Sequence, residues 1–440
     1  MPDTPFRLLG KPDTPALVTY DAYRREGGYA ALQQALTTLT PEQVIAEVRG
    51  AGLRGRGGAG VLTAEKLTLA ARSADGPKYI IANAYDADPR SLISRTLLAR
   101  APHRVLEGMA LAAYAVGASE GFLYMRGGDP ELEATVNRAL RDAQEHGVLG
   151  NGVLGTRFGF VVNLVGAEVG FMGGEESTLI QILKGRPAKA QQRPPYPTEY
   201  GLSNRPTIVQ NAETLANLPN IVARGGDAFR TVGTKATPGT KLFTVLGPAT
   251  AEGNGMLIEV PFGATIQDAL RLAGVTADES TARAVVVGGK EGGALPLSRL
   301  ATPLDFETIE ETGAIIGSSV IEVLASDTCM VAWAMRQSDY LSRESCGKCI
   351  PCRVGVKRIA GTLEGIASGL GAAGDLPLLE EFSRYVPDGS LCGFGVNAVH
   401  PVVTAMQYFA DDFTAHLEGR CPTGVCLPVR THRYVTKHVL

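Results

Sequence analysis

Hydrophobic and polar positions over the first half of the chain follow the periods of strands and helices in turn. Compact apolar runs at 79–84, 121–125 and 158–165 have the length of buried strands. Between them, residues 96–117 form a long apolar segment of helical length, and residues 130–146 form an amphipathic helix with its charges on one face. This alternation predicts an α/β domain with a mainly parallel sheet.

The pattern changes near residue 236. A helical segment at 266–273 lies among short strand-like runs at 241–246, 255–260 and 284–287. These elements predict a small second module of mixed α and β structure, within the usual size of a domain. From residue 327 onward the pattern is helical and is interrupted only by loops that contain cysteine.

The boundary of the first domain is marked by a helix start. Thr40, Pro41 and Gln43 form a capping box with proline in the first turn, so a helix is expected to begin at residue 41. The proline-rich segment before it is expected to be a partly extended arm. We therefore expect four parts: an N-terminal arm over 1–40, an α/β domain over 41–235, a second module over 236–326 and a helical domain over 327–440.

Composition and charge exclude several classes of protein. A formal net charge of −3 gives no electrostatic basis for binding nucleic acid. No uninterrupted apolar run reaches the roughly 18 residues of a membrane span. Residues 1–5 lack the basic and then apolar plan of a signal peptide. We expect a cytoplasmic protein, free or on the cytoplasmic face of a membrane complex, without direct membrane insertion.

All seven cysteines lie at or beyond residue 329. Cys346, Cys349 and Cys352 stand at C-x2-C-x2-C spacing, and Cys392 follows later in the chain. Three ligands from a tight run and a fourth from elsewhere are what a [4Fe–4S] cluster needs. Structural zinc sites usually pair two C-x2-C units, and a redox dithiol needs only one. The clustering in a long chain without a signal peptide also argues against a disulfide framework.

Residues 52–60 form a loop with five glycines and two arginines, and Lys66 follows it. Such a loop permits positive φ angles and brings backbone N–H groups close to an anion. It is not a Walker A loop, because no G-K-[ST] closes it, and it does not match the G-x-G-x-x-G dinucleotide fingerprint. The loop therefore predicts an anion site of another kind, or a flexible connection.

Polar residues stand at two further places where a ligand is expected. Asn83 begins a polar loop after the first strand, at the sheet edge where parallel α/β domains bind ligands. Glu175 and Glu176 open a helix, where acids also serve as caps. Asn211 begins another helix start rich in polar side chains.

Four motifs in this order resemble one family: the glycine loop at 55–60, Gly174-Glu175-Glu176, Asn211-x-Glu213-Thr214 and Glu344-Ser345-Cys346-Gly347-Lys348-Cys349-x-Pro351-Cys352-Arg353. The chain resembles the flavin-bearing, NADH-oxidising 51-kDa-type subunit of respiratory complex I. It equally resembles the diaphorase subunits of NAD-linked or electron-bifurcating hydrogenases and formate dehydrogenases. The resemblance covers about residues 20–430, nearly the whole chain.

The resemblance implies an FMN-binding α/β domain, a ubiquitin-like β-grasp module of the soluble-ligand-binding type and a helical bundle with one [4Fe–4S] cluster. It implies that the FMN and nicotinamide site contains Arg56, Gly57, Gly58, Lys66, Asn83, Asp86, Gly174, Glu175, Glu176 and Asn211. The first four of these would hold the FMN phosphate. The cluster ligands would be Cys346, Cys349, Cys352 and Cys392. No catalytic residue is implied beyond FMN itself, with Glu175 and Tyr85 next to it.

The C-terminal segment Arg420-Cys421-Pro422-Thr423-Gly424-Val425-Cys426 resembles the branch that serves bifurcating and hydrogenase-linked enzymes. Together with Cys329 and His416, its two cysteines form a Cys3His set. By ligand type and number this set predicts a structural zinc site in the tail of the helical domain. The alternative is a group of ordinary buried cysteines beside a surface histidine.

Departures from the family concentrate on the nicotinamide side. Where the family usually has Gly-Phe-Pro-Thr at the end of the glycine loop, this chain has Val61 and Leu62. The aromatic residues that usually follow the lysine are replaced by Leu67 and Leu69. Each lost aromatic ring removes stacking worth on the order of 1 kcal/mol. The dinucleotide site is therefore expected to be altered.

Two more departures lie after the first strand. Tyr85 replaces a small acid that faces the flavin, and its ring is expected to obstruct the nicotinamide. Arg90 replaces a glycine; it is expected to attract the 2′-phosphate of NADPH, to bind another anion or to be solvated. Phe171 replaces a tyrosine before the paired glutamates and keeps the ring.

The resemblance implies an oxidoreductase subunit that passes electrons between NAD(P)H, FMN and the cluster. The alternative is an electron-relay or structural subunit that keeps the cluster, with or without FMN, and no longer binds a nicotinamide. The cofactors implied are FMN, a [4Fe–4S] cluster, NAD(H) or NADP(H) and structural zinc. The partners implied are a small [2Fe–2S] thioredoxin-like subunit and a larger redox subunit: a hydrogenase, a formate dehydrogenase or a complex I-like arm.

Overall fold

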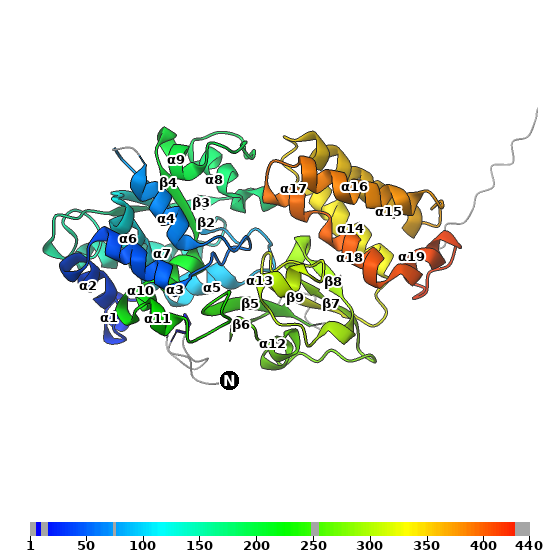
Figure 1. The fold of residues 1–440 in the computed structure, drawn as a ribbon, viewed down its shortest axis with the longest axis horizontal. Coiled ribbons are helices and arrows are strands. Elements are labelled where there is room, and N and C mark those ends of the chain that lie inside the picture. Colours follow the sequence, from blue (N-terminus) through cyan, green and yellow to red (C-terminus); the bar gives the residue numbers. More distant parts are fainter. Residues whose placement is uncertain (1–5, 10–15, 74–75, 248–254, 427–440) are drawn as a thin grey trace, which may run out of the picture.

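The computed structural model describes residues 6–9, 16–73, 76–247 and 255–426. Three parts follow one another along the sequence and pack together (Figure 1): a domain around a first sheet, a smaller module around a second sheet, and a helical module that carries the cysteines. The sequence predicted this succession of an α/β domain, a mixed module and a helical part.

The first sheet is parallel throughout and has the strand order β3-β2-β1-β4. Its strands are β1 (Tyr79–Ala84), β2 (Glu120–Arg126), β3 (Val161–Ala167) and β4 (Thr207–Asn211). Strand β4 pairs with β1, with Ala82 opposite Gln210. The carboxyl ends of β1 and β4, which carry Asn83 and Asn211, therefore meet at one edge. We expected three of these strands and took β4 as the approach to a helix.

Helices cover this sheet and form the largest core (Figure 1). They are α1 (Tyr20–Arg25), α2 (Ala30–Thr38), α3 (Pro41–Ala51), α4 (Thr63–Arg72), α5 (Ile93–Arg100), α6 (Pro102–Val116), α7 (Pro130–Glu145), α8 (Glu176–Leu183), α9 (Pro197–Tyr200), α10 (Ala212–Arg224) and α11 (Gly226–Phe229). Short 3-10 turns lie at Val153–Gly155, Phe171–Gly174 and Leu202–Asn204. Helix α3 begins as predicted, with a capping box between Thr40 and Gln43, and ends at Gly52 in the left-handed conformation.

Residues 20–25 and 30–38 are helical and are joined by a turn, so the expectation of a partly extended arm was wrong for this stretch. The reason is a buried carboxylate on the apolar helix α6. Glu107 accepts hydrogen bonds from the Tyr23 hydroxyl at 2.6 Å, from the Tyr29 N–H at 2.9 Å and from the Leu32 N–H at 3.0 Å. These bonds tie α1 and α2 to the body of the first domain.

The second sheet is mixed and has the order β6-β5-β9-β7-β8. Its strands are β5 (Thr240–Leu246), β6 (Met256–Pro261), β7 (Ala282–Val287), β8 (Gly293–Leu295) and β9 (Val320–Ala325). Only β5 and β9 pair in parallel. Helices α12 (Ile266–Leu272) and α13 (Phe306–Glu310) and 3-10 turns η5 (Gly289–Glu291) and η6 (Leu297–Arg299) complete the module.

The helical module surrounds a core of its own. Its helices are α14 (Met330–Glu344), α15 (Lys357–Ala367), α16 (Asp375–Gly389), α17 (Gly393–Asn397), α18 (His400–Tyr408) and α19 (Ala410–Leu417), with a π-helical turn, η7, at Pro351–Val356. Among the helices of the described ranges, none combines the length and hydropathy that a membrane span requires.

Candidate functional site

A cavity of about 530 Å³ lies where the three parts meet. The first domain contributes the glycine loop, Lys66, Asn83, Asp86, the turn at 171–176, Arg193 and the end of β4. The second module contributes Glu291, Phe306, Glu310 and residues 315–319, and the helical module contributes Gly393, Phe394 and Asn397. A second hollow of about 700 Å³ near Arg7 and α12 contains none of the predicted site residues. The predicted flavin-site residues thus gather around the first cavity.

The glycine loop is wedged between β4 and the second module. A Cβ atom on Gly58, whose φ is 107°, would lie 2.8 Å from the carbonyl oxygen of Gly317. A Cβ atom on Gly57 would lie 3.2 Å from the Cβ of Asn211. Glycine is therefore required at 58 both by conformation and by space. The loop presents bare backbone to the cavity, which suits the close approach of an anion.

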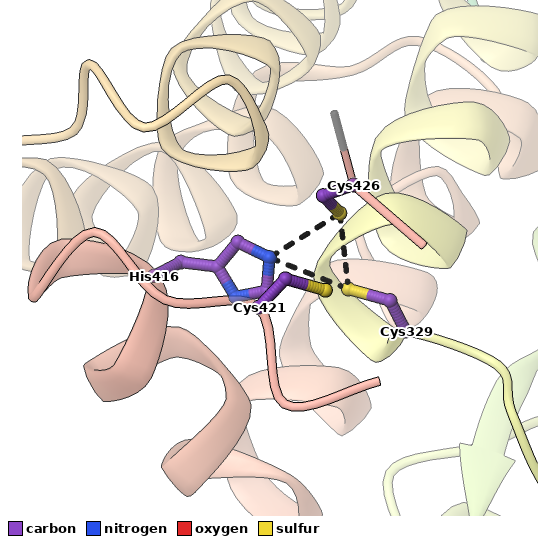
Figure 2. Close-up of side chains that lie close together, drawn as sticks. All are labelled: Cys329, His416, Cys421 and Cys426. Carbon is purple, nitrogen blue, oxygen red and sulfur yellow. Dashed lines mark hydrogen bonds between the residues drawn. The ribbon is translucent and has the colours of Figure 1, made fainter. Parts of the chain in front are cut away.

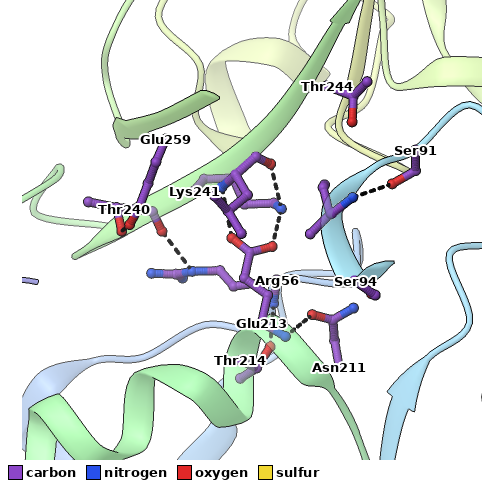
Figure 3. Close-up of polar contacts among 12 residues, drawn as sticks. Arg56, Ser91, Ser94, Asn211, Glu213, Thr214, Thr240, Lys241, Thr244 and Glu259 are labelled. Atoms are coloured by element: carbon purple, nitrogen blue, oxygen red, sulfur yellow. Dashed lines mark hydrogen bonds and ion pairs between the residues drawn. The ribbon is translucent and has the colours of Figure 1, made fainter. Parts of the chain in front are cut away.

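The side chain of Arg56 holds this loop in place through hydrogen bonds to backbone carbonyls (Figure 3). Its buried guanidinium donates to the carbonyls of Pro238 at 2.7 Å, Arg54 at 2.9 Å and Thr240 at 3.1 Å. Burial lowers the pKa of Arg56 to about 10, and the nearby Glu213 opposes that shift. These contacts give the prediction of a phosphate contact through the Arg56 side chain no support. They assign it instead the role of fixing the loop.

A buried ion pair joins the first domain to the second module (Figure 3). Lys241 on β5 and Glu213 on α10 lie with Nζ and Oε2 2.5 Å apart, and both side chains are inaccessible to solvent. Glu213 also accepts a hydrogen bond from the Leu242 N–H at 2.8 Å. Because an unpaired charge at such a depth is very costly, the pair fixes β5 against the first domain. No local pattern in the sequence marks Lys241.

Four charged side chains form a network at the cavity. Lys66 lies 2.7 Å from Glu176, and Arg193 lies 2.7 Å from Glu175 and 3.2 Å from Glu176. Glu175 also caps α8 through the Thr178 N–H at 2.8 Å. Glu175 thus both caps α8 and lines the pocket. Arg193, which precedes two prolines, was missed because no motif marks it.

Asn83 and Asp86 shape the edge of the sheet below the cavity. The Asn83 amide donates to the carbonyl of Gly174 at 2.8 Å, which ties β1 to the turn that carries the two glutamates. Asp86 has a φ of 47° and accepts bonds from the N–H and the hydroxyl of Ser94. Burial raises the pKa of Asp86 to about 6 despite these bonds. Asp86 therefore caps the start of α5 and also lines the pocket.

Tyr85 and Arg90 do not stand where the sequence placed them. The ring of Tyr85 is buried beneath the sheet edge against Tyr124, and its hydroxyl donates to the carbonyl of Val169. It does not line the cavity, so the expected obstruction was wrong. Arg90 is held by Asp88 at 3.0 Å and by Glu322 at 2.6 Å, and it too stands apart from the cavity. Its charge is neutralised across the junction between two parts.

The four cysteines of the predicted cluster lie on neighbouring elements of the helical module and pack on its core. Cys346 and Cys349 follow α14, Cys352 lies in the π-helical turn, and Cys392 precedes α17. The Ser345 hydroxyl lies 3.2 Å from the Cys352 sulfur. Burial raises the pKa of Cys352 to about 11 and that of Cys392 to about 12, so metal binding has to displace protons from these thiols. A loop rich in thiols on a packed helical frame fits an iron–sulfur cluster.

The cavity and the cysteine site share a wall. Gly393 and Phe394, which directly follow Cys392, line the cavity. The rings of Phe394 and Phe171 lie 5.6 Å apart, and Phe171 is fixed because its N–H donates to Glu344 at 2.5 Å. A cofactor in the cavity would therefore be a neighbour of a cluster held by Cys392. Sequence reasoning missed Phe394, although its position next to Cys392 was the available signal.

The predicted Cys3His set also comes together (Figure 2). The ligand atoms of Cys329, His416, Cys421 and Cys426 all lie within 4.8 Å of one another. The Nε2 atom of His416 is 3.3 Å from the Cys426 sulfur and 3.5 Å from the Cys329 sulfur. Its Nδ1 atom lies 2.6 Å from the Asp412 carbonyl, the kind of contact that orients a histidine ligand. The donor set and its closeness fit a tetrahedral zinc ion.

Comparison with known proteins gives consistent matches. Residues 48–220 match the family model described as the Nuo51 FMN-binding domain. Residues 332–416 match the NADH-ubiquinone oxidoreductase-F iron-sulfur binding region. The NADP-reducing hydrogenase subunit HndC of Solidesulfovibrio fructosivorans is 37% identical over 97% of this chain and 86% of that protein. An F-type subunit of the NADH-quinone oxidoreductase of Rhizobium meliloti is 36% identical over 95% of this chain and 98% of that protein.

A solved structure is also similar. It is the NAD+-reducing [NiFe]-hydrogenase in the H2-reduced state, with a TM-score of 0.76 and 34% sequence identity. The match covers 92% of this chain and 66% of the hydrogenase chain, so this chain spans just under two thirds of it. A match over so much of this chain includes most of each of the three parts described above.

Proposed function

The chain belongs to the family of FMN- and iron–sulfur-binding F-type subunits of NADH-quinone oxidoreductases and related hydrogenases, and on that premise we propose how its residues perform electron transfer between NAD(P)H, FMN and a [4Fe–4S] cluster. The observation that carries the proposal is the wall of Gly393 and Phe394 between the cavity and Cys392. FMN, when bound, accepts the two electrons of a hydride and releases them singly. The chain's own residues position FMN and the cluster on the two sides of that wall.

For FMN, the glycine loop with Gly57 and Gly58 is proposed to supply backbone N–H groups to the phosphate, with Lys66 as the nearby cation. Arg56 holds the loop in place through backbone carbonyls. The remaining pocket residues are assigned to the ring and the ribityl chain: Asn83, Asp86, Gly174, Glu175, Glu176 and Asn211. The rigid contacts that these side chains make with one another favour a preformed site.

For the cluster, we assign Cys346, Cys349, Cys352 and Cys392 as the four ligands. The second module, with its mixed sheet and α12, is proposed to be a β-grasp domain of the soluble-ligand-binding type. Helices α14–α19 are proposed to be the helical bundle of the family. The cytoplasmic location stays a prediction.

The nicotinamide is expected to be NADH rather than NADPH. Arg90, the cation that the sequence offered for a 2′-phosphate, is occupied by Asp88 and Glu322. Val61, which is exposed and lines the cavity, leaves an apolar surface for the adenosine half, without aromatic stacking. We therefore expect the flavin absorbance of the purified, FMN-loaded chain to bleach rapidly on addition of NADH, and more slowly with NADPH, under anaerobic conditions.

Two outcomes would contradict this expectation in different ways. Faster bleaching with NADPH would place a 2′-phosphate site elsewhere, with Arg193 as the first candidate. A bound flavin that stays oxidised with both nucleotides would favour the alternative function, an electron-relay subunit without nicotinamide binding. Photoreduction of the same sample serves as the control, since it reduces the flavin without a nucleotide.

Partners are proposed on mechanistic grounds. One flavin and one cluster provide no terminal acceptor, so the chain requires other redox subunits. We propose a small [2Fe–2S] thioredoxin-like subunit and a larger redox subunit, which is a hydrogenase, a formate dehydrogenase or a complex I-like arm. Exposed apolar side chains beside the cluster loop, Ile350 and Val354, favour contact with another protein at this end.

Structural zinc is proposed for the Cys3His set in the tail of the helical module. We expect one zinc beside four irons in metal analysis of the purified chain. Cys421→Ser is expected to remove the zinc and retain the iron, because Cys421 lies outside the predicted cluster set. A wild-type chain without zinc, or one whose iron is lost together with zinc in this variant, would contradict the assignment.

A further inference from the structure

Glu291 is a buried carboxyl group in the wall of the cavity. It ends the 3-10 turn η5 between β7 and β8, and it is 8% exposed. Its Oε2 atom accepts a hydrogen bond from the Asn397 amide at 3.3 Å. Its Oε1 atom is buried and has no hydrogen-bond partner among the described residues. A buried polar atom of this kind ordinarily has a partner, so Oε1 points to a ligand.

No cation compensates this carboxyl group among the residues that the structure describes. The neighbouring Lys290 turns toward the ring of Tyr340, with Nζ 5.1 Å from its centroid. The elements that pack against η5 are α14, α18 and β9, and the loop after β1 also contacts it. Their titratable groups are Asp88 and Arg90 in the loop, Glu322 on β9, Arg336, Asp339, Tyr340, Arg343 and Glu344 on α14, and His400 and Tyr408 on α18. Of these, Arg90 is held by Asp88 and Glu322, and burial lowers the pKa of His400, which keeps that ring neutral. Glu291 therefore stands beside carboxylates that are already paired.

The protonation state of Glu291 follows from these surroundings. Burial, with a smaller contribution from Asp88, raises its pKa to about 8, although the Asn397 amide opposes the shift. Below that pH the side chain is an uncharged carboxylic acid. Its Oε2 atom accepts from Asn397, so its proton belongs on Oε1, which then becomes a donor in the cavity wall.

We propose that Glu291 is a hydrogen-bond donor to FMN: an uncharged carboxylic acid that offers its Oε1–H to an acceptor atom of the bound flavin from the second module. The inference rests on the proposed FMN site. Through Asn397 on α17, Glu291 belongs to the side of the cavity that Gly393 and Phe394 also line. Since the ring has to face the cluster, an acceptor of the ring is the expected partner. Glu291 is thus a positioning and tuning residue for the flavin.

The proposal predicts how three variants bind FMN. Glu291→Gln keeps the shape and an N–H donor, so its affinity for FMN is expected to match that of the wild type at neutral pH. Glu291→Ala removes the donor and is expected to weaken binding about tenfold. Glu311→Gln makes the same chemical change at an exposed position of the same module and serves as the matched control.

The pH dependence of the affinity for FMN distinguishes a hydrogen-bond donor at position 291 from a side chain that only packs against the flavin. As the pH rises through about 8, wild-type Glu291 loses its proton and becomes an anion beside an anionic cofactor. We expect wild-type and Glu311→Gln affinity to fall about tenfold between about pH 7 and about pH 10, while Glu291→Gln stays level. The measurement is fluorescence quenching of FMN, and of riboflavin as a probe without phosphate, on flavin-free protein. Equal pH profiles for wild type and Glu291→Gln would overturn the proposal.

A measurement without flavin tests the protonation itself. The pKa of Glu291 is raised in the folded state, so its contribution to stability is complete below the unfolded pKa of about 4.3 and is lost as the pH rises to about 8. The melting temperature of flavin-free wild type is therefore expected to fall relative to that of Glu291→Gln between about pH 6 and about pH 9. Parallel curves would overturn the donor assignment. If neither wild type nor Glu311→Gln binds FMN at all, the FMN site fails, and the inference fails with it.

Discussion

Replacement of Cys349 by serine is expected to abolish the low-temperature EPR signal of the reduced cluster while FMN stays bound. Cys349 is the middle cysteine of the loop after α14, and neither it nor its neighbours line the flavin cavity. A [4Fe–4S] cluster requires all of its thiolate ligands in the correct geometry, and serine is a poor replacement for cysteine as an iron ligand. The flavin of this variant should still be reduced by the nucleotide and should then hold its electrons.

Two further variants make this result specific. Cys421→Ser, from the Cys3His set, is the matched control and is expected to keep the EPR signal. Cys392→Ser is expected to lose the signal and also to weaken FMN binding, because Gly393 and Phe394 form part of the cavity wall. If Cys349→Ser keeps a wild-type signal, the ligand set is wrong. If it loses FMN as completely as iron, the cavity depends on the cluster for its shape.

Replacement of Lys241 by methionine is expected to lower the free energy of unfolding of the FMN domain by about 3–5 kcal/mol. The change leaves Glu213 buried and unpaired, although its bond to the Leu242 N–H remains. Glu213 lies on α10 two residues after Asn211, so the disturbance also reaches the pocket. Thermal unfolding followed by circular dichroism, with FMN release in parallel, measures both effects.

A double variant and a surface variant separate charge from packing. Lys241→Met together with Glu213→Gln removes the stranded charge and is expected to recover much of the loss. Arg343→Met breaks an exposed ion pair with Asp339 in the helical module and is expected to change stability by less than about 1 kcal/mol. Equal effects of Lys241→Met and Arg343→Met would mean that the Lys241–Glu213 pair is not the junction described above.

The predictions from the sequence were best for features whose residues lie close together in the chain. The cluster motif places three ligands within seven residues, so spacing alone limits what they bind. The capping box at Thr40 and the strands β1, β2 and β3 follow from local periodicity in the same way. Cys329 and His416 lie far apart in the chain, and their association with Cys421 and Cys426 was predicted from ligand type alone.

The sequence failed where the decisive contact joins distant segments. The resemblance implied that Tyr85 lies next to the flavin, but its ring packs against Tyr124 and its hydroxyl donates to the carbonyl of Val169. Burial of a large ring against an apolar core outweighs its exposure in a polar cleft. Arg56 likewise finds carbonyl partners more than 180 positions away. The local sequence pattern indicates neither the burial of the Tyr85 ring nor the carbonyl partners of Arg56.

Glu291 shows a second kind of failure. Its place beside two glycines in a turn reads as an ordinary exposed loop position. The packing of η5 against α14, α18 and β9 removes Glu291 from water, and Asn397 on α17 becomes its partner. A buried acid that is not paired to a base becomes visible only when every neighbour is known. Such groups are often found at functional sites.

The supports of the glycine loop have a consequence for how the protein is made. The loop leaves the ribosome early, but Thr214, Pro238 and Gly317, which hold or flank it, are synthesised much later. Phe394, which belongs to the cavity wall on the side of the helical module, is synthesised after these residues. We therefore expect a growing chain to retain flavin only after the segment that contains Phe394 has been translated. Flavin retention thus reports that synthesis and docking of all three parts are complete.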